Sequence, residues 1–139
     1  MKVSEDNIKA IADELVYVSK KVREEKDILV KVYYVSGAYA VVQRVMNLAY
    51  DDDLVLMHRI LIDAYTTINT NVNSVVAGQE RVIKIPVEVF EALANCFEEL
   101  SKALIEKKDL SKVLARIASI GYIGTGNGYY LYQKGLLKL

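Results

Sequence analysis

The sequence predicts an all-α protein: a bundle of four to five helices with a short Gly- and Tyr-rich C-terminal arm or hairpin. Apolar residues recur at spacings of three and four along the chain, the period of a helix with one buried face. Residues that favour helix ends punctuate these segments, and the connections are short, as in helical bundles. With 139 residues, of which 53% are hydrophobic, we expect a single domain with a sizeable core.

The first helix is predicted from about residue 5 to residue 26. Ser4 is a suitable N-cap, because its hydroxyl accepts a hydrogen bond from a backbone N–H two or three residues later. Glu5 and Asp6 are favourable at the positive end of a helix. We expect another helix to cover the apolar stripe of this helix. The stripe consists of Ile8, Ile11, Leu15, Val18 and Val22.

The second helix, with Asp27 as its cap, is predicted to continue to about Ala49. One face carries Ile28, Val32, Val35, Tyr39, Val42 and Met46, and the other faces are nearly as apolar. This predicts a helix that is central or lies in an interface. Because Val and Tyr favour strands, a hairpin of residues 28–35 and 39–46 is the alternative.

The third helix is predicted at about 53–76, capped by one of three consecutive aspartates and ended by Gly78. Its second half is rich in Thr and Asn, which are poor helix formers, so we expect it to fray. Its apolar stripe contains one histidine and consists of Leu54, His58, Leu61, Tyr65, Ile68, Val72 and Val75.

Residues 79–85 are predicted to be a connector, followed by Pro86 in the first turn of a fourth helix that ends at Lys107 and Lys108. The stripe of that helix is Val89, Leu93, Phe97, Leu100 and Leu104. Asp109 then starts a short fifth helix that Gly121 closes, with its apolar residues at Leu110, Val113, Leu114, Ile117 and Ile120.

The last segment differs in composition, which divides the chain into a bundle at 1–121 and a basic, Gly/Tyr-rich arm at 122–139. Glycines at 124, 126 and 128 favour a hairpin turn. The arm either belongs to the same domain or becomes ordered on a partner. The glycine spacing matches neither a Walker motif nor GxGxxG, so no nucleotide cofactor is predicted.

No convincing catalytic constellation is present, since the chain has one His and one Cys. His58 lies on the stripe of the third helix and is expected in the core or an interface; an enzyme using His58 with Asp52 or Asp53 is the remote alternative. Cys96 is expected to pack as a small hydrophobe. The aspartates at 51–53 lack the EF-hand pattern, so no catalytic residue, cofactor or metal site is predicted.

Charge is unevenly distributed although the net charge is zero. After Asp109 the chain contains basic residues without acidic ones. Proteins that bind single-stranded nucleic acid combine aromatic side chains, which stack on the bases, with cationic side chains, which contact the phosphates. A small subunit gripping nucleic-acid backbone is therefore the alternative function, with contacts at Arg116, Tyr122, Tyr129, Tyr130, Tyr132, Lys134 and Lys138. A solvated surface, or a hairpin packed on the bundle, would explain the same residues.

Self-association is the leading hypothesis, because five short helices cannot easily cover a second helix that is apolar nearly all round. Two-fold dimers are the commonest oligomers, and tyrosines are enriched where interfaces carry their energy. We expect contacts at Tyr33, Tyr34, Tyr39, Val42 and Met46. The predicted function is a non-catalytic scaffold, adaptor or structural subunit that forms a homodimer or higher oligomer. Another protein is the alternative partner.

Composition also bears on location. No stretch offers the roughly 20 mostly apolar residues of a membrane span, and the opening residues do not resemble a secretory signal. A single cysteine cannot form an internal disulfide. We expect a cytoplasmic protein without membrane contact, whose few Gln and many Val, Ile, Lys and Glu residues resemble thermophilic usage.

Overall fold

A computed structural model describes residues 2–139 and is all-helical in that range, with no strand. The predicted bundle is confirmed, with six helices rather than four to five: α1 (Glu5–Glu24), α2 (Ile28–Met46), α3 (Asp52–Val76), α4 (Glu88–Ile105), α5 (Ser111–Tyr122) and α6 (Gly126–Gln133).

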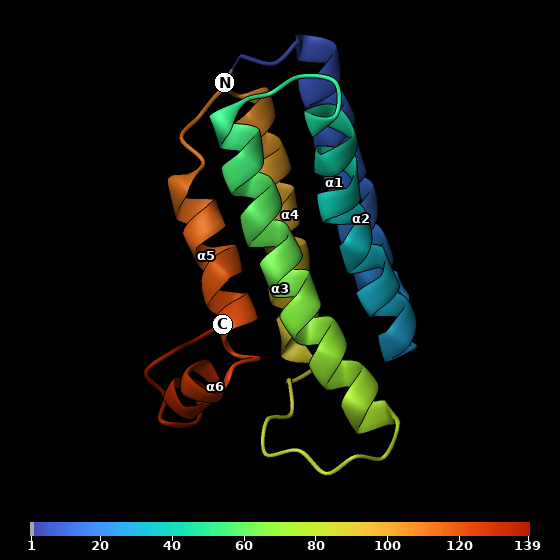
Figure 1. Cartoon of the computed structure of the whole chain (residues 1–139), viewed down its shortest axis with the longest axis vertical. Helices are drawn as coiled ribbons and strands as arrows, with labels where there is room; N and C mark the ends of the chain where they lie inside the picture. Colours follow the sequence, from blue (N-terminus) through green and yellow to red (C-terminus); the bar gives the residue numbers. More distant parts are fainter. Residues whose placement is uncertain (1) are drawn as a thin grey trace.

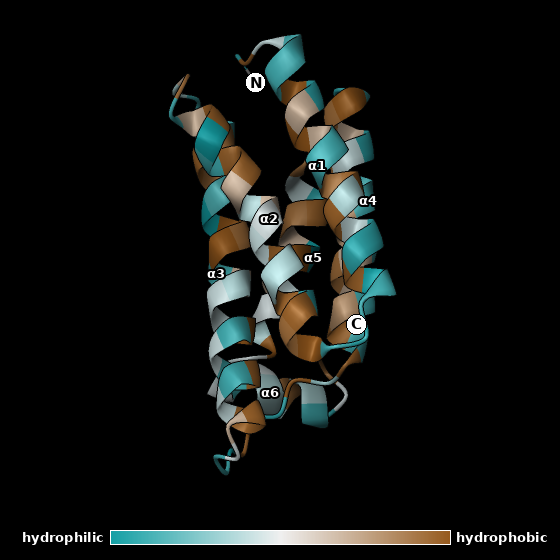
Figure 2. Ribbon diagram, turned by 90° about the vertical axis from the view of Figure 1, so that its right-hand side faces the viewer, coloured by the Kyte–Doolittle hydropathy of each residue, from teal (hydrophilic) through white to brown (hydrophobic). Residues whose placement is uncertain are grey.

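Five helices form a closed ring in the order α1, α2, α3, α5, α4, with each helix packed against its two neighbours in that order. Helices α1 to α5 alternate in direction along the chain, so the neighbours α3 and α5 run the same way (Figure 1). The short α6 lies across the end of α5 (Figure 1). Every ring helix places one face in a common core, and hydrophilic and hydrophobic residues alternate along each ribbon (Figure 2).

The predicted helix caps are present. The Ser4 hydroxyl accepts a hydrogen bond from the Asn7 backbone N–H at 3.2 Å, and the Asp27 carboxylate accepts one from the Leu29 N–H at 2.9 Å. Of the three aspartates, Asp51 is the cap of α3. Residues 28–46 are one helix, so the hairpin alternative is wrong. Capping at Asp27 and packing against two helices outweigh the strand preference of Val and Tyr.

The C-terminal segment contains a helix, α6, so the hairpin alternative is wrong. Thr125 caps α6, and its hydroxyl accepts a hydrogen bond from the Gly128 N–H at 3.1 Å. A Cβ at Gly128 would come 1.8 Å from the Tyr122 carbonyl oxygen, so this glycine permits close packing rather than a hairpin turn. Ile123 is fully buried, and Tyr129, Tyr132 and Leu137 pack against the core.

Two predicted helix ends also differ. Helix α4 stops at Ile105, and Lys107 takes a left-handed conformation with φ of 56°. The Thr/Asn-rich half of α3 is helical as far as Val76, and Asn71 within it holds the connector that follows. Its side-chain amide donates to the Ile83 carbonyl at 2.6 Å and accepts from the Ile85 N–H at 3.1 Å.

Polar contacts fix α1 against α4 and so determine which face of α1 is exposed. The buried Ser101 hydroxyl donates to the Ala12 carbonyl at 2.8 Å. Arg23 forms ion pairs with Glu91, at 3.1 Å, and with Glu98. The remaining side of α1 is shared between α2 and solvent.

Candidate protein-interaction surface

Helix α2 has a face turned away from the helices of the ring, because its main packing partners there are α1 and α3. Residues spaced by three and four share a helix face. We call this face the α2 outer face; it comprises Leu29, Tyr33, Ser36, Ala40 and Arg44. Tyr33 is 69% exposed and Leu29 is 37% exposed. The outer face therefore presents apolar and aromatic groups to solvent.

Three tyrosines meet beside the outer face, where α2 contacts α1. The rings of Tyr33 and Tyr34 lie 5.3 Å apart at 70°, and those of Tyr17 and Tyr34 lie 6.2 Å apart at 76°. Both pairs are edge-to-face, an arrangement that aromatic rings prefer. The ammonium of Lys21 lies 5.8 Å from the Tyr17 ring and 6.0 Å from the Tyr34 ring. We call the outer face together with Tyr17 and Tyr34 the α1–α2 tyrosine surface.

Two lysines near this surface are differently placed: the Lys21 ammonium lies over the Tyr17 and Tyr34 rings. Lys31 turns away from the surface, and its ammonium donates to the Val22 carbonyl at 2.5 Å. Partial burial, followed by the neighbouring Tyr17, raises the pKa of Tyr34, so its hydroxyl stays neutral. Exposed aromatic groups are enriched at the centres of protein interfaces.

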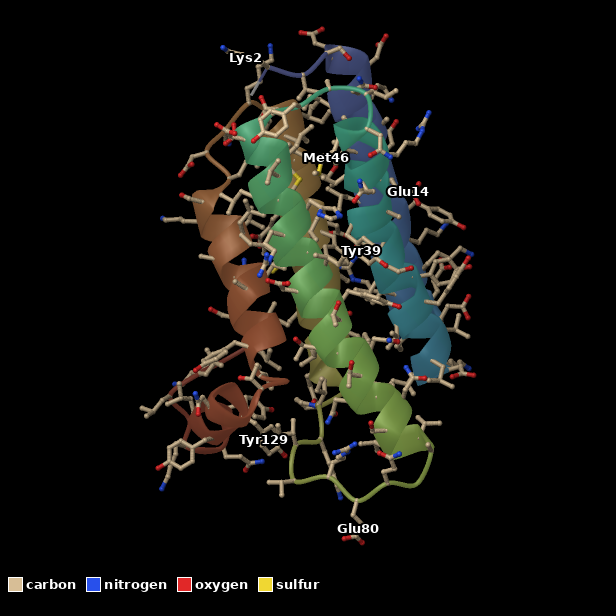
Figure 3. The ribbon with its side chains drawn as sticks, viewed as in Figure 1. Lys2, Glu14, Tyr39, Met46, Glu80 and Tyr129 are labelled. Carbon is tan, nitrogen blue, oxygen red and sulfur yellow. The ribbon has the colours of Figure 1, made fainter. Side chains whose placement is uncertain are left out.

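The predicted self-association residues are divided between this surface and the core. Tyr33 and Tyr34 belong to the surface, whereas Val42 is fully buried and offers no side chain to a partner. Tyr39 lies between α2 and α3 (Figure 3), with its ring 5.1 Å from that of Tyr65. Met46 is half-buried against the core. The prediction assigned all five residues to one contact surface because nearly every side of α2 is apolar.

Sequence reasoning missed Tyr17, which is 46% exposed and lies off the buried stripe of α1. A large aromatic residue on the polar side of an otherwise amphipathic helix is the signal that could have found it. Its proximity to Tyr34 depends on how α1 packs against α2.

The predicted nucleic-acid residues do not form one free basic surface. The Arg116 guanidinium on α5 forms two hydrogen bonds with the Glu99 carboxylate, at 2.7 and 2.6 Å. Lys134 lies 5.6 Å from the ring of Tyr130, which is 60% exposed. Tyr122 is 40% exposed and Lys138 is also exposed.

The other two tyrosines of that set are half-buried. Tyr129 lies on the side of α6 that faces the bundle (Figure 3), and its ring is 6.3 Å from that of Tyr132. Base stacking by these two rings would require α6 to move. Nucleic-acid binding stays a prediction.

His58 and Cys96 lie in different surroundings. The His58 ring is 6.0 Å from that of Tyr39 at 82°, and its buried Nε2 has no hydrogen-bond partner within residues 2–139. Cys96 is fully buried. Burial raises the pKa of its thiol, whereas the charge of Arg116 acts to lower that pKa.

Within the described chain no three His, Cys, Asp or Glu residues gather as metal ligands. None of the helices described there combines the length and the apolar character needed to cross a membrane.

A pocket of about 770 Å³ lies at the end of the bundle where α1, α3 and α5 begin and α4 ends. Leu104 and Leu114 are its buried apolar residues, and Leu56 and Ile105 line it although both are more than half exposed. Its rim is ionic, and one pair at the rim, Lys107 with Glu5, is 3.4 Å apart. These rim charges balance, so they do not select the charge of a ligand.

Comparison of this chain with protein-family models, with curated proteins and with solved structures found no match to any of them.

Proposed function

We propose that this protein is a non-catalytic scaffold, adaptor or structural subunit that associates with a second copy of itself through the α1–α2 tyrosine surface. The observation that carries the proposal is the exposure of Tyr33 on a helix face that the ring leaves uncovered. Tyrosine buries a large area with few rotatable bonds, which makes it a common energetic anchor of interfaces.

The arrangement of this surface supports the proposal. Tyr33 touches Tyr34, which touches Tyr17, so the three rings restrict one another before any partner arrives. Preorganised side chains lose less conformational entropy on binding. A location in the reducing cytoplasm belongs to the same proposal, because the single, buried cysteine needs no oxidising compartment.

The test is the molar mass in solution, measured by size-exclusion chromatography with light scattering over a range of concentrations. The intact protein is expected to run as a dimer or higher oligomer, and Tyr33→Asp is expected to dissociate it at least tenfold more readily, because a carboxylate would be buried at the interface. Tyr130→Asp is the matched control, since Tyr130 is a similarly exposed tyrosine on α6.

Melting followed by circular dichroism shows whether each variant is folded. A parent that stays monomeric at high micromolar concentration would contradict the proposal. So would an equal loss of mass in the two variants, because the effect would then not depend on the tyrosine surface.

A further inference from the structure

The pocket of about 770 Å³ lies at the end of the bundle that is uppermost in Figure 1. In the ring, α1 is a neighbour of neither α3 nor α5, yet all three helices contribute to the walls, together with the end of α4 and the turn into α5. No described lining residue belongs to α2. The volume falls within the roughly 300–1,000 Å³ that is usual for small-molecule sites.

Apolar side chains line the pocket from each of these four helices. They include Ile8 of α1, Leu56 of α3, Ile105 of α4 and Leu114 of α5. Leu56 is 53% exposed and Ile105 is 54% exposed, although leucine and isoleucine are usually buried. A ligand with an apolar body would remove this surface from water, and the free energy gained increases with the area removed. The walls therefore favour an apolar ligand.

The charged groups at the rim are three lysines and three acids, which balance. Each lysine forms an ion pair with a carboxylate of this chain, at 2.6, 3.4 and 2.8 Å: Lys9–Asp13, Lys107–Glu5 and Lys108–Glu106. Among the acids, Asp109 accepts hydrogen bonds from the backbone N–H of Ser111, at 3.3 Å, and from its hydroxyl. A rim with paired cations and no net charge does not attract a charged ligand over a neutral one.

Lys107, at the rim, has a backbone conformation that favours glycine. Its φ is 56°, and the other positive φ values in the described chain belong to Gly78 and Gly135. Each of the three is the second residue after the end of a helix, α4, α3 and α6 respectively. A side chain is unfavourable there, but lysine supplies a rim group that pairs with Glu5 of α1. Because unfavourable backbone conformations cluster at ligand sites, Lys107 supports a binding function for the pocket.

We propose that this pocket binds an uncharged, largely apolar small molecule, whose body packs against Leu56, Ile105 and Leu114. A hydroxyl group on that molecule would remain at the mouth, where water and the ionic rim satisfy its hydrogen bonds. The proposal goes beyond self-association and does not depend on it, because the pocket and the α1–α2 tyrosine surface share no described residue.

Binding is measured by the fluorescence of N-phenyl-naphthylamine, an uncharged dye that brightens in apolar surroundings, and by its displacement. The competitors are octanol, octanoate and octylammonium, which share a similar apolar chain and differ in charge. We expect one dye per chain with a dissociation constant of about 10 µM. Octanol is expected to displace the dye at concentrations at least about fivefold lower than either ion, because an ion loses hydration when it approaches apolar walls.

Substitutions in two walls locate the site. Leu56→Asp introduces a carboxylate into the pocket and is expected to weaken dye binding at least about tenfold, and Ile105→Asp is expected to do the same from a different wall. Val76→Asp is the matched control, because Val76 is also 53% exposed and lies at the other end of α3. Tyr33→Asp should leave dye binding unchanged, which separates this site from the tyrosine surface. Melting followed by circular dichroism shows whether each variant is folded.

The amide chemical shifts that change on adding octanol are expected to centre on residues 103–111 and not on α2. A parent that binds neither the dye nor octanol with a dissociation constant of about 1 mM or lower would overturn the proposal. Equal weakening by Leu56→Asp and Val76→Asp would also overturn it, because binding would then not depend on the pocket. Displacement by either ion as readily as by octanol would contradict the uncharged class of ligand.

Discussion

Gly121 lies at a close approach between α3 and α5. A Cβ at this position would come 2.8 Å from both Cα and Cβ of Ala64. Backbone cannot yield as the end of a flexible side chain can, so the two helices would have to separate. Gly121 is therefore a packing residue, although its place near a helix end suggested a stop signal.

Gly121→Ala is expected to lower the free energy of unfolding by roughly 1–3 kcal/mol, the usual cost of overpacking. Urea denaturation followed by circular dichroism measures it. The matched control is Gly126→Ala, because a Cβ at Gly126 has no neighbour within 4 Å; alanine there should be neutral or stabilising. Equal effects at the two glycines would contradict the packing explanation.

Asp51, the N-cap of α3, makes the stability of the fold depend on pH in the acidic range. Its carboxylate accepts hydrogen bonds from the Lys2 N–H at 2.7 Å and the Asp53 N–H at 2.9 Å. These bonds, that of Lys2 first, lower the pKa of Asp51 despite its burial. A carboxyl whose folded pKa lies below its unfolded value of about 3.9 stabilises the fold above that pH. The contribution is lost as the pH falls through the folded pKa.

Asp51→Asn keeps a good N-cap but cannot ionise. The parent is expected to be more stable than this variant near neutral pH, and the difference should vanish as the pH falls below the folded pKa of Asp51. Chemical denaturation over a series of pH values from about 6 down to about 2 measures the difference. The same substitution at Asp6 is the control, since that carboxylate accepts no hydrogen bond within residues 2–139; a pH-independent gap at Asp51 would refute the linkage.

Among the elements, the connector between α3 and α4 shows how a weak helix former can have a tertiary role. Composition predicts fraying where Asn71 lies, yet both ends of its side-chain amide bind the backbone of the connector, at Ile83 and Ile85. These partners lie 12 and 14 residues away, a distance at which local propensity carries no information. The connector is thus held along α3.

Asn71→Ala should release the connector and accelerate tryptic cleavage after Arg81 and Lys84 by about tenfold, because losing two partly buried hydrogen bonds makes local opening easier by at least about 1 kcal/mol. Limited proteolysis with mass spectrometry locates the cuts. Asn73→Ala is the control, since the amide of Asn73 bonds only to Asn69 within its own helix. If both variants are cut at the parent rate, Asn71 does not hold the connector.

At the scale of the whole molecule, the ring order explains the uncovered face on which the proposed self-association rests. Helix α2 is nearly all apolar, which favoured a central position, but the ring gives it two neighbours and leaves its outer face free. The packing of the ring also gives a basic residue near the C-terminus an acidic partner. Arg116 has no acidic neighbour in the sequence after Asp109, yet packing of α5 against α4 brings it to Glu99.

The apolar spacings and the capping residues by themselves determined that the segments α1 to α5 are helices, because both are local properties of the chain. They did not determine which helices are neighbours. In α3, Met57 and Ala64 are buried while His58 and Tyr65 are half-buried, since α2 and α5 pack on different sides of this helix. Exposure of Tyr17 beside Tyr34, and the pocket at the end of the bundle, were likewise decided by packing between segments far apart in the sequence.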